Sequence, residues 1–251
     1  MSGHSHWAKV KRAKAVTDNK RGSVWSKLAR RIIVAAKTVG GDPGENLMLR
    51  YAIDEAKAEN MPRDTIQNAI KKGTGELGAA VYERIMYEAY GPGGVALMID
   101  CLTDNRSRTA PELRNTLERV NGELAQTNSV GWMFQQKGTF VIAASLVAED
   151  KLIEICLDAG ADDVKTEGDV YEVTCEPTKY NLVKEALAKN QIETVSAQVA
   201  FMPKTTVTPP VEKARQVLTL METLEDNEDV QNVYTNMDIP EELVAKLAGK
   251  P

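Results

Sequence analysis

Cations gathered at the N-terminal end are the residues with the clearest chemical potential in this sequence. Residues 1–40 contain ten lysines and arginines but a single acidic residue, Asp18, so this stretch carries a net charge of +9. The whole chain has a net charge of −5, and residues 41–251 therefore sum to −14. Because ammonium and guanidinium groups pair with phosphate oxygens, this division predicts that the N-terminal end binds a polyanion and that the remainder is repelled by one.

The candidate nucleic-acid contacts are these cations and one aromatic residue in the same segment. They are Lys9, Lys11, Arg12, Lys14, Lys20, Arg21, Lys27, Arg30, Arg31 and Trp7. Trp7 lies within a short basic arm, where its indole ring could stack on a base, as aromatic side chains do on unpaired RNA. The alternative is that the ring is buried and pins the arm to the folded body, and both interpretations stay open.

An amphipathic helix is predicted over residues 23–39, with Ser23 as its N-cap and Gly40-Gly41 as its end. At about 100° per residue, one face of this helix collects apolar side chains and the opposite face collects cations. The apolar face comprises Trp25, Leu28, Ile32, Ala35, Ala36 and Val39, and the cationic face comprises Lys27, Arg30, Arg31 and Lys37. A charged helix face is often an ordinary solvated surface, but the basic arm directly upstream favours contact with nucleic acid.

A second, weaker phosphate-contact candidate is the pair Arg106 and Arg108. Thr109 and Glu112 have the spacing of a capping box, which predicts that a helix begins just after the two arginines and ends near residue 121. Cations ahead of a helix N-terminus oppose the helix dipole and require an anion or solvent to compensate them. Pairing with local acids such as Asp104 and Glu112 is the competing interpretation.

No arrangement typical of catalysis or cofactor binding is present. The sequence has no phosphate-binding glycine loop, no zinc-protease motif, no nucleophile elbow and no dinucleotide fingerprint. His4 and His6 are the only histidines and have no third ligand nearby. Acidic clusters within 158–169 and 222–229 lack calcium-loop spacing and are interpreted as solvated faces that repel phosphate or meet a basic protein. We therefore expect no catalytic residue, no cofactor and no metal, with a hydrolase built only from carboxylates as a minor alternative.

The bulk composition is that of a globular chain that does not enter a membrane. Apolar residues make up 43% and charged residues 27% of it, and no apolar run approaches the roughly 20 residues of a membrane span. Cys101, Cys156 and Cys175 form no Cys-x-x-Cys pair and are expected to be reduced, buried thiols of a cytoplasmic protein.

The periodicity downstream of the first helix predicts two more helices, then a change to strands. Helices are expected at 46–59 and 62–72, the latter ending at Gly73, and strands at 82–90 and 95–102. Residues 134–202 then have the element order β-α-β-β-α-β, the split pattern of ferredoxin-like domains. In this segment the expected elements are 139–142, 149–159, 164–166, 170–174, 179–189 and 194–201. A helix at 211–225, a strand at 230–234 and a short helix from Pro240 follow.

We predict an α+β fold of three domains preceded by an arm. The expected parts are a basic arm at 1–22, an N-terminal helical bundle at 23–76, a discontinuous α/β domain at 77–133 and 203–251, and a ferredoxin-like α/β domain at 134–202 inserted into it.

Several stretches carry a resemblance to a known family. They are Gly3-His4-Ser5-His6-Trp7-Ala8, Ala13-Lys14 with Lys20-Arg21-Gly22, Gly41-Asp42-Pro43, residues 60–66, residues 70–73, and residues 87–94 through 103–109. Together they resemble the YebC/PmpR family, which includes mitochondrial translational activators of cytochrome c oxidase. His6 stands where many members have lysine. The resemblance implies a helical domain plus two α/β domains, one inserted in the other, and a cytoplasmic, non-enzymatic regulator of gene expression.

Two functions are compatible with the family and with the charges. In the first, the protein is a DNA-binding transcriptional regulator. In the second, it is a ribosome-associated, RNA-binding translation factor that helps synthesis through proline-rich stretches. The expected partners are DNA in the first case and ribosomal RNA with the ribosome in the second, with no membrane in either. The sequence does not specify the oligomeric state.

Overall fold

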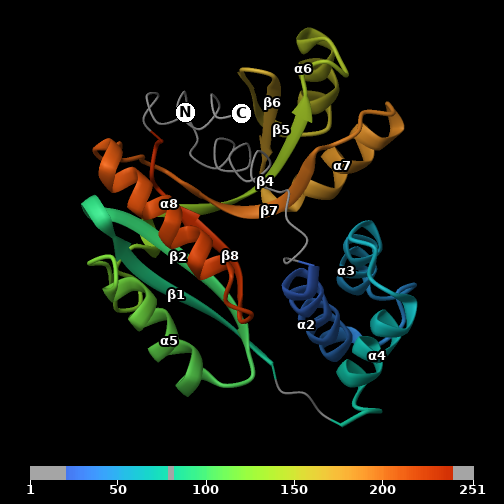
Figure 1. Cartoon of the computed structure of the whole chain (residues 1–251). Coiled ribbons are helices and arrows are strands. Elements are labelled where there is room, and N and C mark those ends of the chain that lie inside the picture. Colours follow the sequence, from blue (N-terminus) through green and yellow to red (C-terminus); the bar gives the residue numbers. More distant parts are fainter. Residues whose placement is uncertain (1–20, 79–81, 240–251) are drawn as a thin grey trace. The chain divides into compact units, whose positions relative to one another are not determined.

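A helical region followed by two four-stranded sheets makes up the part of the chain that the computed structural model describes, residues 21–78 and 82–239 (Figure 1). The helices are α2 (Arg21–Val39), α3 (Leu47–Ala58), α4 (Arg63–Thr74), α5 (Arg106–Glu118), α6 (Glu149–Asp158), α7 (Tyr180–Lys189) and α8 (Val211–Glu225). The strands are β1 (Glu83–Gly91), β2 (Val95–Thr103), β3 (Glu123–Leu124), β4 (Phe134–Ala143), β5 (Ala161–Glu167), β6 (Val170–Cys175), β7 (Ser196–Pro203) and β8 (Val230–Thr235). This is the predicted α+β class, and the helix expected from Pro240 lies outside the described residues.

Helices α2, α3 and α4 form the predicted bundle because α2 packs on both α3 and α4, and each helix contributes an apolar stripe to one core. The stripe of α2 includes Leu28, Ile32, Ala35 and Ala36, as its periodicity predicts. On α3 the buried residues are Leu49, Ala52, Ile53 and Ala56, and on α4 they are Ile66, Ala69 and Ile70. The indole Nε1 of Trp25 donates a hydrogen bond of 3.0 Å to the carbonyl of Glu59, just after α3.

Two details of the predicted apolar face of α2 are wrong. Val39 is 61% exposed, and Ile33, which was not assigned to that face, is buried. Periodicity identifies the direction in which a side chain points, but it does not show how far the neighbouring helices extend along the axis.

Asn46 connects the end of α2 to the start of α3. Its Oδ1 accepts a hydrogen bond from Leu49 N, as an N-cap does, and its Nδ2 donates to the carbonyls of Ala35 and Gly40, both at 2.8 Å. The side chain is buried, so all three bonds are shielded from water. One residue thus satisfies open groups of both helices.

The predicted end of α4 at Gly73 is wrong, because the helix continues to Thr74 and Gly75 adopts the left-handed conformation that ends it. Gly73 instead marks a close approach between helices. A Cβ atom there would lie 2.6 Å from the carbonyl oxygen of Ile33 and 2.6 Å from Ala36 Cβ, so only glycine lets α4 pack this closely on α2.

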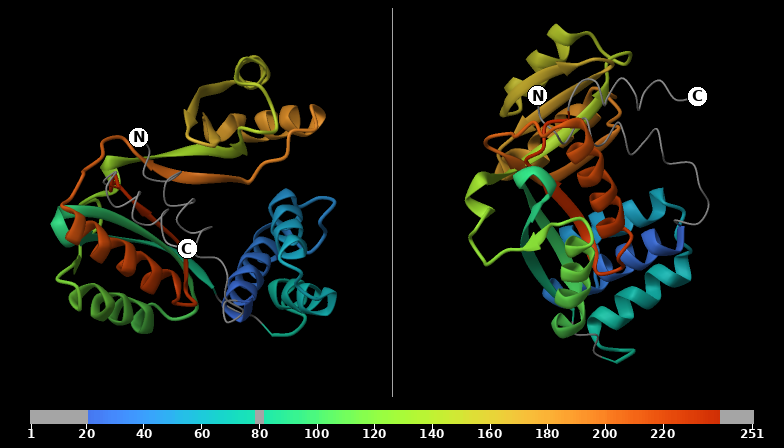
Figure 2. Two further views of the ribbon diagram at one scale, coloured as in Figure 1. Left: turned by 45° about the horizontal axis from the view of Figure 1, so that its top comes forward. Right: turned by 60° about the vertical axis from the view of Figure 1, so that its left-hand side comes forward.

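The first sheet has the strand order β3-β1-β2-β8. Strands β1 and β2 correspond to the strands predicted at 82–90 and 95–102, and they pair antiparallel as a hairpin from Glu83 opposite Thr103 to Gly91 opposite Val95. Helices α5 and α8 pack beside each other on this sheet (Figure 2). The two-residue strand β3 was not predicted, since it is too short for a periodic signal.

The second sheet has the order β5-β6-β4-β7 with every neighbouring pair antiparallel. In this arrangement β6 lies between β4 and β5, which α6 connects, as the split βαβ pattern of a ferredoxin-like domain requires. Alternate residues such as Phe140, Ile142 and Val173 face Leu152 of α6 and Val183 of α7 in one core. The exact domain boundaries given above remain predictions.

Cys101, Cys156 and Cys175 carry free thiols and are buried, as predicted. Burial raises the pKa of the Cys156 and Cys175 thiols to about 11 in each case. Within residues 21–78 and 82–239, no helix is long and apolar enough to cross a membrane.

Candidate nucleic-acid interface

Most of the predicted basic arm lies outside the residues that the structure describes. This applies to Trp7, Lys9, Lys11, Arg12, Lys14 and Lys20, and only the backbone of Arg21, the first residue of α2, is described. Helix α2 begins at Arg21, two residues before the predicted N-cap Ser23. Of the predicted primary contacts, the structure therefore places the side chains of Lys27, Arg30 and Arg31.

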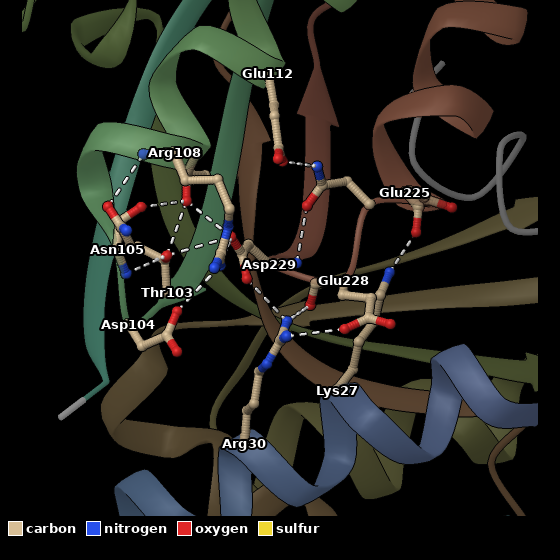
Figure 3. Close-up of polar contacts among 12 residues, drawn as sticks. Lys27, Arg30, Thr103, Asp104, Asn105, Arg108, Glu112, Glu225, Glu228 and Asp229 are labelled. Carbon is tan, nitrogen blue, oxygen red and sulfur yellow. Dashed lines mark hydrogen bonds and ion pairs between the residues drawn. The ribbon is translucent and has the colours of Figure 1, made fainter. Parts of the chain in front are cut away.

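Two of these cations contact residues 225–229, which comprise the last residue of α8 and the segment that connects α8 to β8 and which we call the acidic loop (Figure 3). Lys27 Nζ donates to the backbone carbonyl of Glu225. Arg30 donates to the backbone carbonyl of Glu228 and, through Nη2, to Glu228 Oε2 at 3.1 Å. Arg30 Nη1 also lies 3.1 Å from Asp229 Oδ1. The loop thus surrounds this end of the arginine, whose side chain is only 12% exposed.

Arg31 has partners of its own on either side of the helix. Its Nη1 donates to both carboxylate oxygens of Glu55 on α3 at 2.8 Å, and its Nε donates to Gln231 Oε1 on β8 at 3.0 Å. Lys27, Arg30 and Arg31 thus have partners within the protein, whereas Lys37, the fourth cation of that face, is exposed. As nucleic-acid contacts, Lys27, Arg30 and Arg31 remain predictions. Glu225, Glu228 and Gln231 are about 200 positions away in sequence, so no local pattern could have revealed them as partners.

Asp229 is the centre of the polar contacts in Figure 3. Its Oδ2 accepts hydrogen bonds from the hydroxyls of Thr103 at 3.2 Å and Thr109 at 2.7 Å, and from Arg108 Nη2 at 2.7 Å. Its carboxylate is 3% exposed. Sequence reasoning placed Asp229 only in an acidic cluster, and its role is visible only after α5, β2 and the acidic loop come together.

The ionisation of Asp229 follows from these contacts. Burial by itself raises the pKa of the carboxyl group, because it disfavours the charged form. Hydrogen bonds from Arg108, Thr109 and Arg30, with the charge of Arg30, outweigh that effect and lower the pKa below its ordinary value. The same pairing raises the pKa of Arg108. Asp229 is therefore a carboxylate at neutral pH and holds two guanidinium groups.

The predicted capping box at Thr109 and Glu112 is wrong. Helix α5 begins at Arg106, and its N-cap is Asn105, whose Oδ1 accepts from Arg108 N at 3.1 Å. The Thr109 hydroxyl bonds to Asp229 instead of capping the helix. Asn and Asp compete with Thr as caps, and here the residue four positions earlier takes that role because Thr109 is needed inside the fold.

The competing interpretation of Arg108 is confirmed in part. Arg108 pairs with Asp104 at 3.0 Å, as considered above, and more closely with Asp229, whereas Glu112 accepts from Asn227 Nδ2. Arg106 lies 3.4 Å from Glu83, and both side chains are largely exposed. As phosphate contacts, Arg106 and Arg108 remain predictions.

A polar hollow of about 300 Å³ is the space around these side chains. It is lined by Arg30, Asp104, Arg108, Glu112, Asn227, Glu228 and Asp229. Two guanidinium groups and four carboxylates give the lining a formal charge of −2, so in this arrangement the hollow repels phosphate. In the described part of the chain, no group of three or more His, Cys, Asp or Glu side chains is placed to hold a metal ion.

The other predicted acidic cluster is partly neutralised as well. Asp162 pairs with Lys137 at 2.8 Å, and Asp163 pairs with Lys165 at 3.3 Å, all within the second sheet. These are surface pairs that contribute little stability.

The fold and the polar contacts around Asp229 define the class of protein. It is an α+β protein of three domains in which carboxylates and carbonyls of the chain itself contact the basic helix α2. Two family descriptions match this chain, the TACO1/YebC protein N-terminal domain over residues 5–76 and the TACO1/YebC second and third domain over residues 82–237. The chain belongs to the TACO1/YebC family.

Relatives match the chain along its whole length. A protein from Geobacter sulfurreducens is 49% identical over 247 residues, which cover 98% of this chain and 100% of that protein. One from Desulfatibacillum aliphaticivorans is 48% identical over 246 residues, with the same coverage. Each is named a probable transcriptional regulatory protein. The crystal structure of a conserved hypothetical protein from Aquifex aeolicus superimposes with a TM-score of 0.82 at 40% identity, covering 90% of this chain and 93% of that one.

Proposed function

We propose that this protein is a non-enzymatic regulator of gene expression that binds duplex DNA through its N-terminal end. The observation that carries this proposal is the charge division, +9 over residues 1–40 against −14 over the rest. A chain so divided is drawn to a polyanion at one end only. The name shared by its full-length relatives, probable transcriptional regulatory protein, supports DNA as that polyanion.

The arm makes the first contact in this proposal. Lys27, Arg30 and Arg31 have partners within the protein, whereas Lys9, Lys11, Arg12 and Lys14 are four cations within six positions and include no acid between them. Phosphate contacts of this kind position a protein on DNA without reading sequence. Any preference for a particular promoter must come from contacts to base edges or from DNA shape.

A ribosome-associated translation factor is the second candidate. Residues 41–251, with their charge of −14, suit a partner that exposes basic protein as well as nucleic acid, as a ribosome does. Trp7 in the arm also suits stacking on unpaired RNA bases.

Binding at one fixed physiological salt concentration separates these candidates. A promoter fragment, a random duplex of equal length and purified ribosomes are titrated with the full chain. Preference for the promoter over the random duplex supports the DNA regulator. Saturable ribosome binding together with sequence-blind, salt-sensitive DNA binding favours the translation factor instead.

Charge reversal tests whether the arm is the contact. Changing Lys9, Lys11, Arg12 and Lys14 to Glu should abolish binding to either partner. A matched control changes four exposed lysines elsewhere, Lys151, Lys179, Lys189 and Lys213, to Glu, which alters the net charge by the same amount. If both variants lose affinity equally, only the net charge matters, and unchanged affinity in the arm variant would reject the arm.

A further inference from the structure

We propose that residues 225–228 of the acidic loop are a built-in competitor for nucleic acid: they occupy the α2 cations Lys27 and Arg30 in the unbound protein and are displaced by phosphate on binding. This inference rests on the proposed function, since it concerns how the same N-terminal end engages its polyanion.

The geometry of the contacts is that of a phosphate site filled by the protein itself. Lys27 and Arg30 are three positions apart and therefore project from the same side of α2. Both donate to oxygen atoms of the acidic loop, and Arg30 reaches a carboxylate oxygen of Glu228 at 3.1 Å (Figure 3). Carboxylate and phosphate oxygens accept from guanidinium groups in the same way, so a phosphate can take the Nη2 donor that Arg30 now gives to Glu228.

Exposure indicates which contacts can exchange. The Glu228 side chain is 64% exposed, and an ion pair with so exposed a carboxylate is weak and easily replaced. Asp229 is different, because its buried carboxylate is held by Thr103, Thr109 and Arg108. We therefore assign Glu228 as the exchangeable partner of Arg30, while Asp229 stays with α5 and β2.

Charge distinguishes the two states. With the loop in place, the lining of the hollow has a charge of −2 and repels phosphate. With residues 225–228 displaced, the lining loses the charge of Glu228, Lys27 adds its charge to that of the basic arm, and Arg30 keeps Asp229 as its remaining carboxylate partner. The apparent affinity for nucleic acid is the affinity of the open state multiplied by the fraction of molecules in which the loop is open.

Glu228→Gln is the direct test, because it removes the carboxylate charge and keeps the size of the side chain. The affinity for a duplex, measured by fluorescence anisotropy on the full chain, should rise about two- to fivefold, the worth of one exposed ion pair. Glu112→Gln is the matched control. Glu112 lines the same hollow and carries the same charge, but its carboxylate accepts from Asn227 Nδ2 and not from a cation of α2. It should change the affinity by less than Glu228→Gln.

A double-mutant cycle with Arg30→Gln identifies the cation involved. Arg30→Gln should lower the affinity, and in its presence Glu228→Gln should have no effect, because the loop then has no Arg30 to release. In addition, binding of the duplex to the wild-type chain should speed hydrogen exchange at the amides of residues 226–228.

Several results would overturn this inference while leaving the proposed function intact. The affinity for the duplex could be unchanged in Glu228→Gln, could rise equally in Glu112→Gln, or could rise by the same factor with and without Arg30. Hydrogen exchange at residues 226–228 could also stay unchanged on binding. In each case the arm variant would still fail to bind. The failure of the wild-type chain to bind any nucleic acid or ribosome would instead reject the proposed function itself.

Discussion

Asp229 connects more of this molecule than any other side chain in the polar cluster. It contacts Thr103 at the end of β2, Thr109 and Arg108 on α5, and Arg30 on α2. Its backbone takes part too, since Asp229 N donates to Asn227 Oδ1 and its carbonyl accepts from Leu102 N. A buried carboxylate with this many donors is costly to remove, because the donors are then left without an acceptor.

Asp229→Ala should therefore lower the free energy of unfolding by about 2–4 kcal/mol. This is somewhat less than for a fully buried ion pair, since Arg108 is 43% exposed and water can solvate it. Urea denaturation measures the change. The control is Asp104→Asn, which removes the exposed partner of the same arginine and should cost less than about 1 kcal/mol. Equal losses in the two variants would contradict the central role of Asp229.

The lowered pKa of Asp229 gives this stabilisation a defined pH dependence. The unfolded carboxyl group titrates near its ordinary value of about 3.9, and the folded one titrates lower. The contribution is thus fully present above about pH 4 to 5 and is lost as the pH falls through the folded pKa. In unfolding experiments from pH 7 to pH 3, the difference in stability between wild type and Asp229→Asn should be constant at first and then shrink. A difference that grows as the pH falls would mean that the pKa is raised.

Helix α2 uses both of the faces that its sequence pattern predicts, the apolar one and the cationic one. One face packs on α3 and α4, and the opposite face contacts the acidic loop and β8. The sequence pattern correctly separated the two faces, because a period of 3.6 residues is a local property. It did not identify what covers the cationic face, since Glu228 and Gln231 are separated from it by most of the chain.

The close contact between α2 and α4 makes Gly73 sensitive to substitution. In Gly73→Ala, the new Cβ would lie 2.6 Å from the carbonyl oxygen of Ile33, a backbone atom that cannot move independently. Overpacking of this kind costs about 1–3 kcal/mol, of which the better helix propensity of alanine returns up to about 1 kcal/mol. We expect a net loss of about 1–2 kcal/mol in chemical denaturation.

Asn68→Ala is the control for that substitution, because Asn68 lies on the same helix and is exposed. It should be neutral or slightly stabilising, as alanine has the higher helix propensity. If Gly73→Ala were stabilising to the same extent, the close approach of the two helices would be refuted.

The molecule as a whole has a positively charged N-terminal end and a negatively charged remainder. The salt dependence of binding should show how many of its cations contact phosphate. If about five cations contact B-DNA, log K should fall by roughly 4 to 5 for each tenfold increase in salt concentration. If Arg30 becomes one of them, Arg30→Gln should reduce that slope by about 1. Lys213→Gln, an exposed site on α8, should leave it unchanged. A slope near zero for the wild type would exclude phosphate contacts as the source of affinity.

The sequence by itself determined the α+β class, the three-helix bundle and the ferredoxin-like order of the second sheet, because hydrophobic periodicity and turn residues act over a few positions. It also located helix α8 at Val211–Glu225 and the hairpin of β1 and β2 closely. Where it failed locally, at Thr109 and Gly73, a distant contact overrode the local preference: Asp229 engages the threonine hydroxyl, and Ile33 leaves no room for a Cβ atom.

Only the tertiary structure decided which groups the predicted cations pair with. Charge counting finds Lys27, Arg30, Arg31 and Arg108, but it does not show whether their partner is a ligand or the protein itself. Folding brings the acidic loop to α2 and to α5, each more than 100 residues away from it in sequence, and electrostatic pairing depends on distance in space and on burial. Glu228 and Asp229, which appeared in the sequence as part of a separate acidic surface, are carboxylate partners of Arg30 on the basic helix in the folded chain.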